Sequence, residues 1–542
     1  MRRIGVLVAA VAVLTAGILA AVVRGPDAQA LENGVARTPP MGWNSWNTFG
    51  CNINDALIRQ MADAIVSSGM RDLGYKYVVV DDCWMNSTRD AQGNLQANAS
   101  RFPNGMKALG DYLHSRGLLF GIYQAPLDKT CAQYFGSYPG ATGSQGHEAQ
   151  DARQFAAWGV DYLKYDWCSP SGSISEQVTT FAKMRDALAA TGRPIVYSIN
   201  PNSIHAKTGP QRNWGDVANM WRTTEDITNT WDSGQSNGYP MGIQNIVNVT
   251  VPLAGYAAPG RFNDPDMLEV GRGGMNDTEM RSHFALWAMM ASPLIAGNDI
   301  RSQSAATATI LKNQNLIAIN QDSLGLQATQ VSNDGTRRVL AKRLANGDVA
   351  VALFNQGGSA TTVSTTAAAA GKSGGSFTLR DAWTNATSTT TGSISATVPA
   401  HGTVVYRVSG GGTSTPPAGS TLVSAASGRC LDVPNSSTAN GTQPVIWDCN
   451  GGTNQRWTVD GQTIQALGKC LDAPVNATAG AKAQLWDCNG GTNQQWTLNA
   501  DGTVRGTASG LCLDVDRNLT ANGTVVLLWT CTAAANQRWT RG

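Results

Sequence analysis

The sequence has few charged residues, few histidines and no strong excess of charge of either sign. Only 14% of its 542 residues are charged, 5 are His, and the formal net charge is +2. Binding to the phosphates of a nucleic acid requires clustered Lys and Arg. No basic run follows Arg2 and Arg3, so a nucleic-acid partner is not expected.

Long apolar runs are confined to the N-terminus. Arg2 and Arg3 precede the apolar stretch 4–23, and Ala28-Gln29-Ala30 follows it as a small-x-small cleavage site. This order predicts a signal peptide over residues 1–30 and a secreted, extracellular mature chain with no membrane attachment. An uncleaved membrane anchor is the alternative, because the stretch is long enough to span a bilayer.

Cysteine pairs with metal-ligand spacing are also missing. The chain has 10 Cys, none in a Cys-x-x-Cys pair or a Cys/His cluster, so no metal site is predicted. Export to an oxidising compartment favours disulfides over free buried thiols.

The C-terminal region contains three similar units. Each has Cys-Leu-Asp, then Trp-x-Cys, then Asn-Gln-x-Trp, beginning at Cys430, Cys470 and Cys512. A unit of about forty residues buries too little surface to fold alone, so three are expected to share one core. Trp457, Trp496 and Trp539 are predicted to belong to that core.

This pattern resembles the ricin-B-type β-trefoil lectin, also classed as carbohydrate-binding module family 13. The resemblance implies a sugar pocket in each repeat, with an Asp accepting hydroxyl hydrogen bonds, a Trp stacking on the ring, and an Asn orienting the Asp. At least one pocket is expected to function. The residues are Asp432, Trp447 and Asn454; Asp472, Trp486 and Asn493; and Asp514, Trp529 and Asn536. The implied disulfides are Cys430–Cys449, Cys470–Cys488 and Cys512–Cys531.

The N-terminal region alternates short apolar runs with amphipathic stretches, which predicts a (β/α)8 barrel. The expected strands are 41–46, 77–82, 118–123, 161–166, 194–199, 220–224, 262–267 and 294–298. Their C-terminal ends carry a set of polar and aromatic residues: Trp43, Trp46, Asp81, Asp82, Tyr123, Lys164, Asp166, Asn200, Arg222, Asp226, Asp264 and Asp266. Since function lies at this end of such barrels, we expect a sugar site in which two carboxylates perform glycoside hydrolysis without a metal or organic cofactor. Trp43 and Trp84 are predicted to pack inside the barrel, and direct catalysis by Asp264 or Asp266 is not expected.

Seven motifs in this region resemble the melibiase-type α-galactosidases of glycoside hydrolase family 27. They are the segments 41–47 (MGWNSWN), 80–84 (VDDCW), 121–123 (GIY), 162–166 (YLKYD), 221–227 (WRTTEDI), 263–268 (NDPDML) and 319–322 (INQD). The resemblance implies Asp166 as nucleophile and Asp226 as acid/base in a retaining double displacement. It also implies Cys51–Cys83 and Cys131–Cys168 disulfides.

The same resemblance assigns roles around a galactose ring. Asp81 and Asp82 would bind O4 and O6, and Arg222 would hold the O2 side. Lys164 would bind ring hydroxyls and keep Asp166 ionised. The remaining contacts would come from Trp46 near C6, Tyr123 beside the nucleophile, Asn200, and Met267 on the pocket wall.

Two segments depart from the family pattern. Ile199-Asn200-Pro201 stands where many relatives have Cys-Glu-Trp, so recognition at sugar C2 is expected to differ. Gln124-Ala125-Pro126 replaces the usual Ser-Asp-Ala or Ala-Asp-Val and is expected to alter the third loop and the leaving-group subsite. His205 is expected to be a surface residue.

The predicted organisation is a signal peptide (1–30), a catalytic barrel (31–323), an antiparallel β-domain of sandwich type (324–409), a Gly/Ser/Thr/Pro linker (410–420) and a β-trefoil (421–542). The predicted partner is a galactose-containing oligo- or polysaccharide, and the predicted activity is that of a secreted, retaining α-galactosidase. A β-L-arabinopyranosidase on the same fold is the alternative, because that sugar is galactose without its C6 hydroxymethyl group. A non-catalytic lectin on a decayed barrel is the remote alternative.

Overall fold

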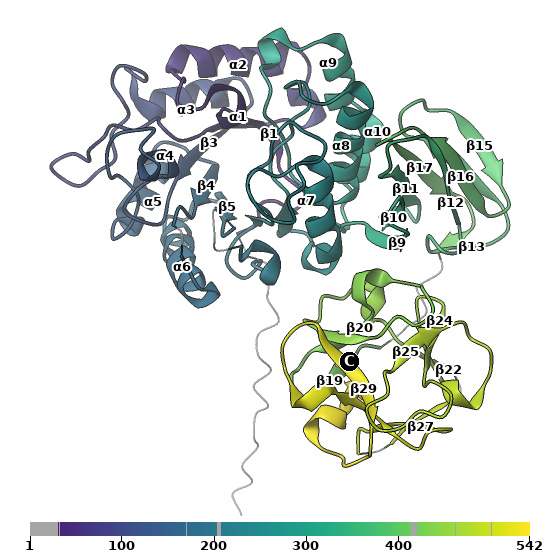
Figure 1. Ribbon diagram of the computed structural model, residues 1–542. Coiled ribbons are helices and arrows are strands. Elements are labelled where there is room, and N and C mark those ends of the chain that lie inside the picture. The colour runs from purple at the N-terminus through teal and green to yellow at the C-terminus, as the bar shows by residue number, and fades with distance from the viewer. Residues whose placement is uncertain are drawn as a thin grey trace, which may run out of the picture.

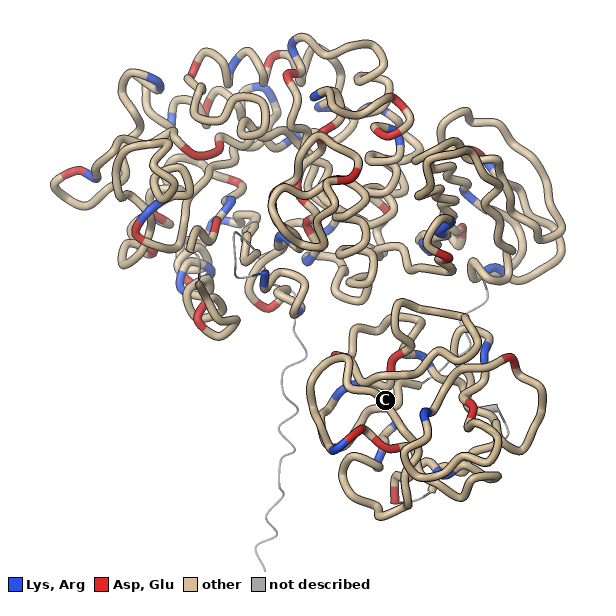
Figure 2. Tube along the Cα trace, in the orientation of Figure 1, with Lys and Arg blue, Asp and Glu red and all other residues tan. Residues whose placement is uncertain are grey.

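Three bodies follow one another along the chain in the computed structural model (Figure 1). The structure describes residues 31, 33–169, 171–202, 207–413, 420–460, 462–499 and 501–541. The predicted signal peptide, most of the predicted linker and His205 lie outside the described residues. Charged residues are sparse in all three bodies and form no face of one sign in the view of Figure 2.

The first body is a barrel of eight parallel strands, as predicted. The strands are β1 (Met41–Asn44), β2 (Tyr77–Val80), β3 (Leu119–Gln124), β4 (Tyr162–Asp166), β5 (Val196–Asn200), β6 (Met220–Arg222), β7 (Phe262–Asp264) and β8 (Leu294–Ala296). The sheet order is β7-β6-β5-β4-β3-β2-β1-β8. A parallel bridge between Leu268, beyond β7, and Ala296 in β8 closes the remaining gap.

Helices cover the outside of the barrel, and local capping explains where several of them start. The main helices are α2 (Asp55–Ser67), α3 (Gly105–Ser115), α5 (Glu148–Ala157), α6 (Ile174–Ala190), α7 (Ile243–Thr250), α8 (Asp277–Met289), α9 (Ala305–Leu311) and α10 (Gln314–Asn320). Ser173 with Glu176 begins α6 and Asn276 with Glu279 begins α8, each pair forming a reciprocal capping box. Between β5 and β6 the described residues form only the 3-10 turn Gly209–Gln211, so strict alternation fails there.

The second body is an antiparallel β-sandwich, as expected. Its larger sheet has the order β15-β14-β17-β11-β10-β9 and faces the pair β12-β16. The strands are β9 (Thr329–Asn333), β10 (Arg337–Arg343), β11 (Val349–Asn355), β12 (Thr361–Thr366), β14 (Phe377–Asp381), β15 (Thr387–Thr390), β16 (Ser393–Val398) and β17 (Thr403–Ser409). β13 (Lys372–Ser373) pairs with β18 (Gly412–Thr413).

The sandwich packs on α8 of the barrel (Figure 1). The hydroxyl of Ser282 in α8 donates to His401 O at 2.6 Å, and the His401 ring stacks on Trp231 at 5.1 Å between centroids. Trp231 lies in the loop that follows Asp226. The sandwich therefore supports a loop at the C-terminal rim of the barrel.

The third body is the predicted β-trefoil. Its strands are β19 (Leu422–Ser424), β20 (Cys430–Asp432), β21 (Val445–Trp447), β22 (Thr458–Asp460), β23 (Thr463–Ala466), β24 (Lys469–Asp472), β25 (Gln484–Trp486), β26 (Trp496–Leu498), β27 (Val504–Gly506), β28 (Cys512–Val515), β29 (Thr524–Trp529) and β30 (Trp539–Arg541). Trp457, Trp496 and Trp539 are buried, and each indole N–H donates to the Leu carbonyl of its own Cys-Leu-Asp motif. The prediction that these tryptophans form a shared core is confirmed.

The trefoil contacts both other bodies through its first repeat. The Gln330 amide of β9 donates to Asn435 O at 2.6 Å. A Cβ added to Gly255 of the barrel would lie 1.0 Å from Asn450 O, so a side chain cannot be accommodated at this close backbone approach.

Within the described residues, no helix combines the length and the apolar composition that spanning a bilayer requires.

Candidate active site and lectin pockets

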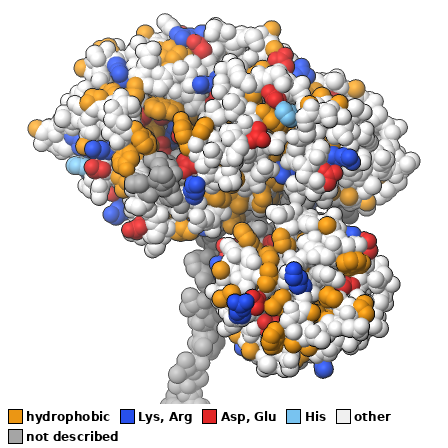
Figure 3. Space-filling model, in the orientation of Figure 1, with side chains coloured by type: hydrophobic (Ala, Val, Ile, Leu, Met, Phe, Trp, Pro, Cys, Tyr) orange, Lys and Arg blue, Asp and Glu red, His pale blue; other side chains and the backbone are white. Residues whose placement is uncertain are grey.

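A cavity of about 710 Å³ opens at the C-terminal ends of the barrel strands. It brings together all ten barrel residues proposed from the sequence: Trp46, Asp81, Asp82, Tyr123, Lys164, Asp166, Asn200, Arg222, Asp226 and Met267. Figure 3 shows a hollow in the larger body, with charged side chains visible inside it and hydrophobic side chains around its rim. Such a cavity can enclose more than one sugar ring.

Asp166 ends β4 and has two differently placed carboxylate oxygens. Oδ2 accepts a hydrogen bond from the Tyr123 hydroxyl at 3.2 Å, and Cys131 Sγ lies 3.1 Å from the same oxygen. Oδ1 is buried and has no hydrogen-bond partner among the described residues. Its lone pairs are therefore available to a group in the cavity.

Burial raises the pKa of Asp166 to about 6, while the positive charge of Lys164 opposes this rise. As expected, the Lys164 charge lowers the pKa of Asp166 and so favours its ionised form. Its effect is smaller than that of burial, which raises the pKa. Lys164 makes its hydrogen bond to Asp81 Oδ2, at 2.8 Å, rather than to Asp166. Its neighbours, Asp81 and Asp166 foremost, raise the pKa of Lys164 against the effect of burial.

Asp81 and Asp82 follow β2 and retain accepting capacity toward the cavity. Asp81 accepts from Asn44 Nδ2 and Lys164 Nζ on Oδ2 and from the Asp82 amide on Oδ1. Asp82 accepts the amides of Cys83 and Ala132, and burial raises the pKa of Asp82 to about 7. A carboxylate has about four lone-pair sites, so each can accept a further hydroxyl.

Arg222 at the end of β6 connects two acidic side chains. Its Nη2 lies 3.0 Å from Asp226 Oδ1 and 2.8 Å from Asp266 Oδ2. The Asp226 side chain is 54% exposed, so it lies at the mouth of the cavity. Asp266 also accepts the Ile227 amide at 3.0 Å. Asp266 therefore braces the Asp226 segment through Arg222 and the Ile227 amide.

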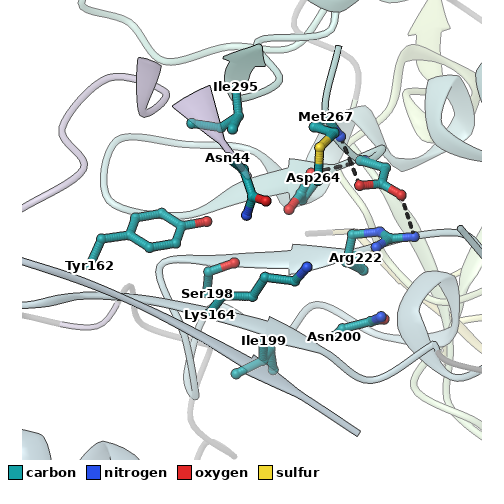
Figure 4. A pocket seen from close by; sticks show the side chains of 11 residues that line it. Asn44, Tyr162, Lys164, Ser198, Ile199, Asn200, Arg222, Asp264, Met267 and Ile295 are labelled. Carbon is teal, nitrogen blue, oxygen red and sulfur yellow. Dashed lines mark hydrogen bonds and ion pairs between the residues drawn. The ribbon is translucent and has the colours of Figure 1, made fainter. Parts of the chain in front are cut away.

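A smaller recess of about 30 Å³ shares Lys164, Asn200, Arg222, Asp266 and Met267 with the larger cavity. Figure 4 shows Lys164 and Arg222 extending into it, with Asn44 and Asp264 on its other side. Ile199 lines this recess and not the larger cavity. Asp264 also lines the recess, and burial raises the pKa of Asp264 to about 6.

Several cavity residues were not expected from the sequence. Phe135 and Tyr239 line the mouth, and Asn44 orients Asp81 from beneath. The first two lie in irregular loops, where only an aromatic residue among Gly, Ser and Pro could have drawn attention. Gln124 is buried with its amide donating to Thr142 O at 3.0 Å and does not line the cavity. Gln124 therefore cannot contact a leaving group directly, and any effect of this segment on the leaving-group subsite acts through the loop that Gln124 holds.

The predicted packing tryptophans lie in the core. Trp43 and Trp84 are fully buried, and their indole N–H groups donate to Asn298 O and Tyr123 O. Among the described residues, Cys131, Asp166 and Cys168 form a cluster close enough for a metal. Cys131 and Cys168 are disulfide-bonded to each other, so neither supplies a thiolate ligand.

The structure contains the five disulfides that the resemblance implied. They are Cys51–Cys83, Cys131–Cys168, Cys430–Cys449, Cys470–Cys488 and Cys512–Cys531. The second bridge joins the loop carrying Phe135 to the residue two places beyond Asp166. No described cysteine is free.

Each trefoil repeat places its three proposed residues around one carboxylate. In the first repeat, Asn454 Nδ2 and Gln455 Nε2 both donate to Asp432 Oδ2 at 2.8 Å. The same amides act on Asp472 in the second repeat and on Asp514 in the third. The adjacent tryptophans Trp447, Trp486 and Trp529 are 42%, 40% and 46% exposed.

The repeats differ at one position. In the second repeat, Gln484 Nε2 donates to Asp472 Oδ1 at 3.0 Å. The equivalent residues of the first and third repeats are Val445 and Leu527, whose side chains cannot donate a hydrogen bond. Burial raises the pKa of Asp432 to about 6 and raises that of Asp514 as well.

The fold and the two kinds of site define a glycoside hydrolase joined to a carbohydrate-binding lectin domain. Residues 38–322 match the family described as Alpha galactosidase A, residues 334–408 the Alpha galactosidase C-terminal beta sandwich domain, and residues 418–539 the Ricin-type beta-trefoil lectin domain. The chain belongs to the α-galactosidase A family, glycoside hydrolase family 27.

Known relatives agree with this assignment. The chain is 43% identical over 401 residues to Alpha-galactosidase A of Cellvibrio japonicus, covering 71% of this chain and 94% of the relative. It is 43% identical over 383 residues to Alpha-galactosidase of Cyamopsis tetragonoloba, covering 69% and 87%. The crystal structure of α-galactosidase I from Mortierella vinacea superposes with a TM-score of 0.66 at 36% identity, covering 71% of this chain and all of that one.

Proposed function

We propose that this protein is a secreted, retaining α-galactosidase that removes terminal α-linked D-galactose from oligo- or polysaccharides. The observation that carries the proposal is the unpartnered Asp166 Oδ1, which is buried in the same cavity as Asp226, Asp81 and Asp82. A carboxylate at the base and a more exposed one at the mouth supply a nucleophile and an acid/base.

In the first step, a lone pair of Asp166 Oδ1 forms a bond to the anomeric carbon while the glycosidic C–O bond breaks. Asp226 gives its proton to the departing oxygen. With its pKa at about 6, Asp166 is mainly ionised at neutral pH. In the second step, Asp226 takes a proton from water, the water oxygen bonds to the anomeric carbon, and the bond to Asp166 breaks.

Asp81 and Asp82 support the choice of galactose. The Lys164 ammonium and the Asn44 amide fix the Asp81 carboxylate, while two backbone amides fix that of Asp82. A pair of fixed acceptors suits the axial O4 and the O6 of galactose. Exclusion of glucose follows, because its equatorial O4 points away from that pair.

The lectin domain would hold the enzyme on its polymer. Three pockets in one trefoil provide several weak contacts, and tethering raises the local concentration of substrate without altering the chemistry. The five disulfides support passage through an oxidising compartment.

The test is hydrolysis of p-nitrophenyl α-D-galactoside compared with p-nitrophenyl β-L-arabinopyranoside, with NMR of the first-formed anomer. We expect a preference for the galactoside and release of the α-anomer. A clear preference for the arabinoside would instead establish the β-L-arabinopyranosidase alternative. Absence of turnover on a wide panel of glycosides, with polysaccharide binding retained, would favour the non-catalytic lectin.

A further inference from the structure

Exposed aromatic side chains in this protein gather at its carbohydrate sites. Over the described part of the chain, the markedly exposed aromatic residues are Tyr134, Phe135, Tyr239, Trp447, Trp486 and Trp529. Each of the three tryptophans lies on a strand that pairs with the strand carrying a lectin carboxylate, and Phe135 and Tyr239 line the barrel cavity. Tyr134 packs edge-on against Phe135 at 5.2 Å between ring centroids. Exposed apolar surface gathered beside a cavity marks a binding surface.

Phe135 and Tyr239 stand on different walls of the cavity mouth. Phe135 is 61% exposed and follows the short helix α4 (Cys131–Tyr134), in the loop after β3. Tyr239 is 71% exposed and lies in the loop after β6. Two strands separate β3 from β6 in the sheet, and Asp166 is on one of them. The two rings therefore flank the space above the nucleophile.

The Phe135 wall is joined directly to the galactose-binding end of the cavity. Its backbone N–H donates to Cys131 O at 2.9 Å, and Cys131 is disulfide-bonded to Cys168 beside the nucleophile strand. The amide of Ala132 in the same helix donates to Asp82 Oδ2 at 2.9 Å. The position of the Phe135 ring is thus coupled to one of the carboxylates proposed to bind O4 and O6.

The Tyr239 wall is joined to the acid/base segment in a similar way. Asn237 Oδ1 accepts the Glu225 amide at 3.1 Å, and the Met241 amide donates to Asp226 O at 2.9 Å. Tyr239 lies between these two attachments, so its backbone is fixed relative to Asp226. A proton donor and an aromatic ring held together at a mouth suit the leaving-group side of a glycosidic bond.

We propose that Phe135 and Tyr239 form a leaving-group subsite that stacks on a sugar ring attached to the reacting galactose. This rests on the α-galactosidase function proposed above and adds to it two residues that determine how well a sugar leaving group is bound. The cavity of about 710 Å³ has room for this second ring. Aromatic faces contact the apolar C–H face of a pyranose while its hydroxyls remain hydrated.

The same subsite acts in both directions across the reaction. It receives the leaving sugar in the first step and, after the glycosyl-enzyme forms, can hold a second sugar whose hydroxyl replaces water. Galactose is then transferred to that hydroxyl oxygen, Asp226 accepts the hydroxyl proton, and the bond to Asp166 breaks.

The experiment compares two donors that differ in the leaving group. α-D-Galactosyl fluoride has no ring to stack, whereas α-D-galactopyranosyl-(1→6)-D-glucose does. For the disaccharide we expect Phe135→Ala and Tyr239→Ala each to lower kcat/KM by about two- to tenfold, the range for losing one aromatic contact. The double variant should lose the product of the two factors, and the fluoride should change less than about twofold in every variant.

Tyr134→Ala is the neighbouring control, because Tyr134 is exposed and precedes Phe135 but does not line the cavity, although its ring packs on Phe135. It should lower disaccharide kcat/KM clearly less than Phe135→Ala does and leave the fluoride unchanged, and Phe135→Trp should retain disaccharide hydrolysis. A second readout uses the fluoride as donor with added glucose as acceptor. The ratio of transfer to hydrolysis should fall in the same variants and by similar factors.

Unchanged disaccharide kinetics in the double variant would overturn the subsite while leaving the proposed function intact. Equal losses on both donors, or a loss in Tyr134→Ala as large as in Phe135→Ala, would show a structural effect instead of stacking. If the unmodified enzyme hydrolysed neither donor, the proposed function would fall and the subsite with it.

Discussion

The Tyr123 hydroxyl donates to Asp166 Oδ2, and this hydrogen bond helps to distinguish the two oxygens of the carboxylate. Oδ2 is held in place, while Oδ1 has no partner among the described residues and lies in the catalytic cavity. The hydrogen bond favours the charged form of Asp166, whereas burial disfavours it. Burial is the largest influence and raises the pKa of Asp166 to about 6, and the positive charge of Lys164 is the main influence that opposes this rise.

The first prediction concerns the acid limb of the pH profile. In the proposed mechanism only ionised Asp166 attacks carbon, so kcat/KM should fall about tenfold per pH unit below pH 6. Tyr123→Phe removes a donor that stabilises the carboxylate, which raises the pKa of Asp166. The acid limb should therefore move to higher pH, as measured with an unactivated galactoside between pH 4 and 8.

A lower plateau with an unmoved acid limb would mean that Tyr123 acts on substrate position and not on Asp166. Tyr138→Phe serves as the control, because the Tyr138 hydroxyl donates to Met85 O and Tyr138 is absent from the cavity. Its pH profile should match that of the unmodified enzyme.

The Cys131–Cys168 bridge should stabilise the barrel and preserve its catalytic rim. Closing a loop of this sequence separation of 37 contributes about 3–4 kcal/mol in the chain-entropy account. Cys131→Ser with Cys168→Ser should lower the barrel's melting temperature and kcat/KM together, because α4 carries the amide that contacts Asp82. Calorimetry and kinetics on one preparation measure both.

The trefoil offers a matched pair for this experiment. Cys470→Ser with Cys488→Ser removes a bridge of sequence separation 18 from the lectin domain. That variant should lower the trefoil transition and leave hydrolysis of a small galactoside unchanged. An equal loss of activity in both double variants would argue against a specific role for the barrel bridge.

Two kinds of tryptophan in the trefoil should separate binding from folding. Replacing the exposed Trp447, Trp486 and Trp529 together by Ala should abolish retention on galactose-bearing polysaccharide while preserving the melting temperature. Trp457 is fully buried, and Trp457→Ala should cost about 3–5 kcal/mol of trefoil stability. Affinity electrophoresis measures retention on the polysaccharide, and calorimetry measures the stability of the trefoil. Full retention by the triple variant would show that these tryptophans do not bind sugar.

The sequence predicted the parts of this structure that rest on repetition or on strand ends. The threefold Cys-Leu-Asp and Asn-Gln-x-Trp pattern predicted the shared trefoil core, because each copy must bury the same face. Polar residues after apolar runs predicted the catalytic rim, since the ends of parallel strands meet at one edge.

Other features depend on contacts that no local pattern records. The hydrogen-bond partner of Lys164 is Asp81, which follows β2 and lies 83 residues earlier in the chain, so a motif that contains only Lys164 and Asp166 could not reveal it. Between β5 and β6 the described residues form only the short 3-10 turn Gly209–Gln211, where Gly209 and Pro210 do not favour a longer helix. Phe135 and Tyr239 reach the cavity only because a disulfide and backbone hydrogen bonds fix their loops.

Covalent labelling tests the assignment of the nucleophile most directly. A 5-fluoro-α-D-galactosyl fluoride should inactivate the enzyme by accumulating the glycosyl-enzyme, and peptide mass spectrometry should place one galactosyl adduct on Asp166. The adduct should be absent in Asp166→Asn, which should still bind polysaccharide through the trefoil. An adduct on Asp226, or turnover of the fluorosugar that releases only the β-anomer, would contradict the mechanism.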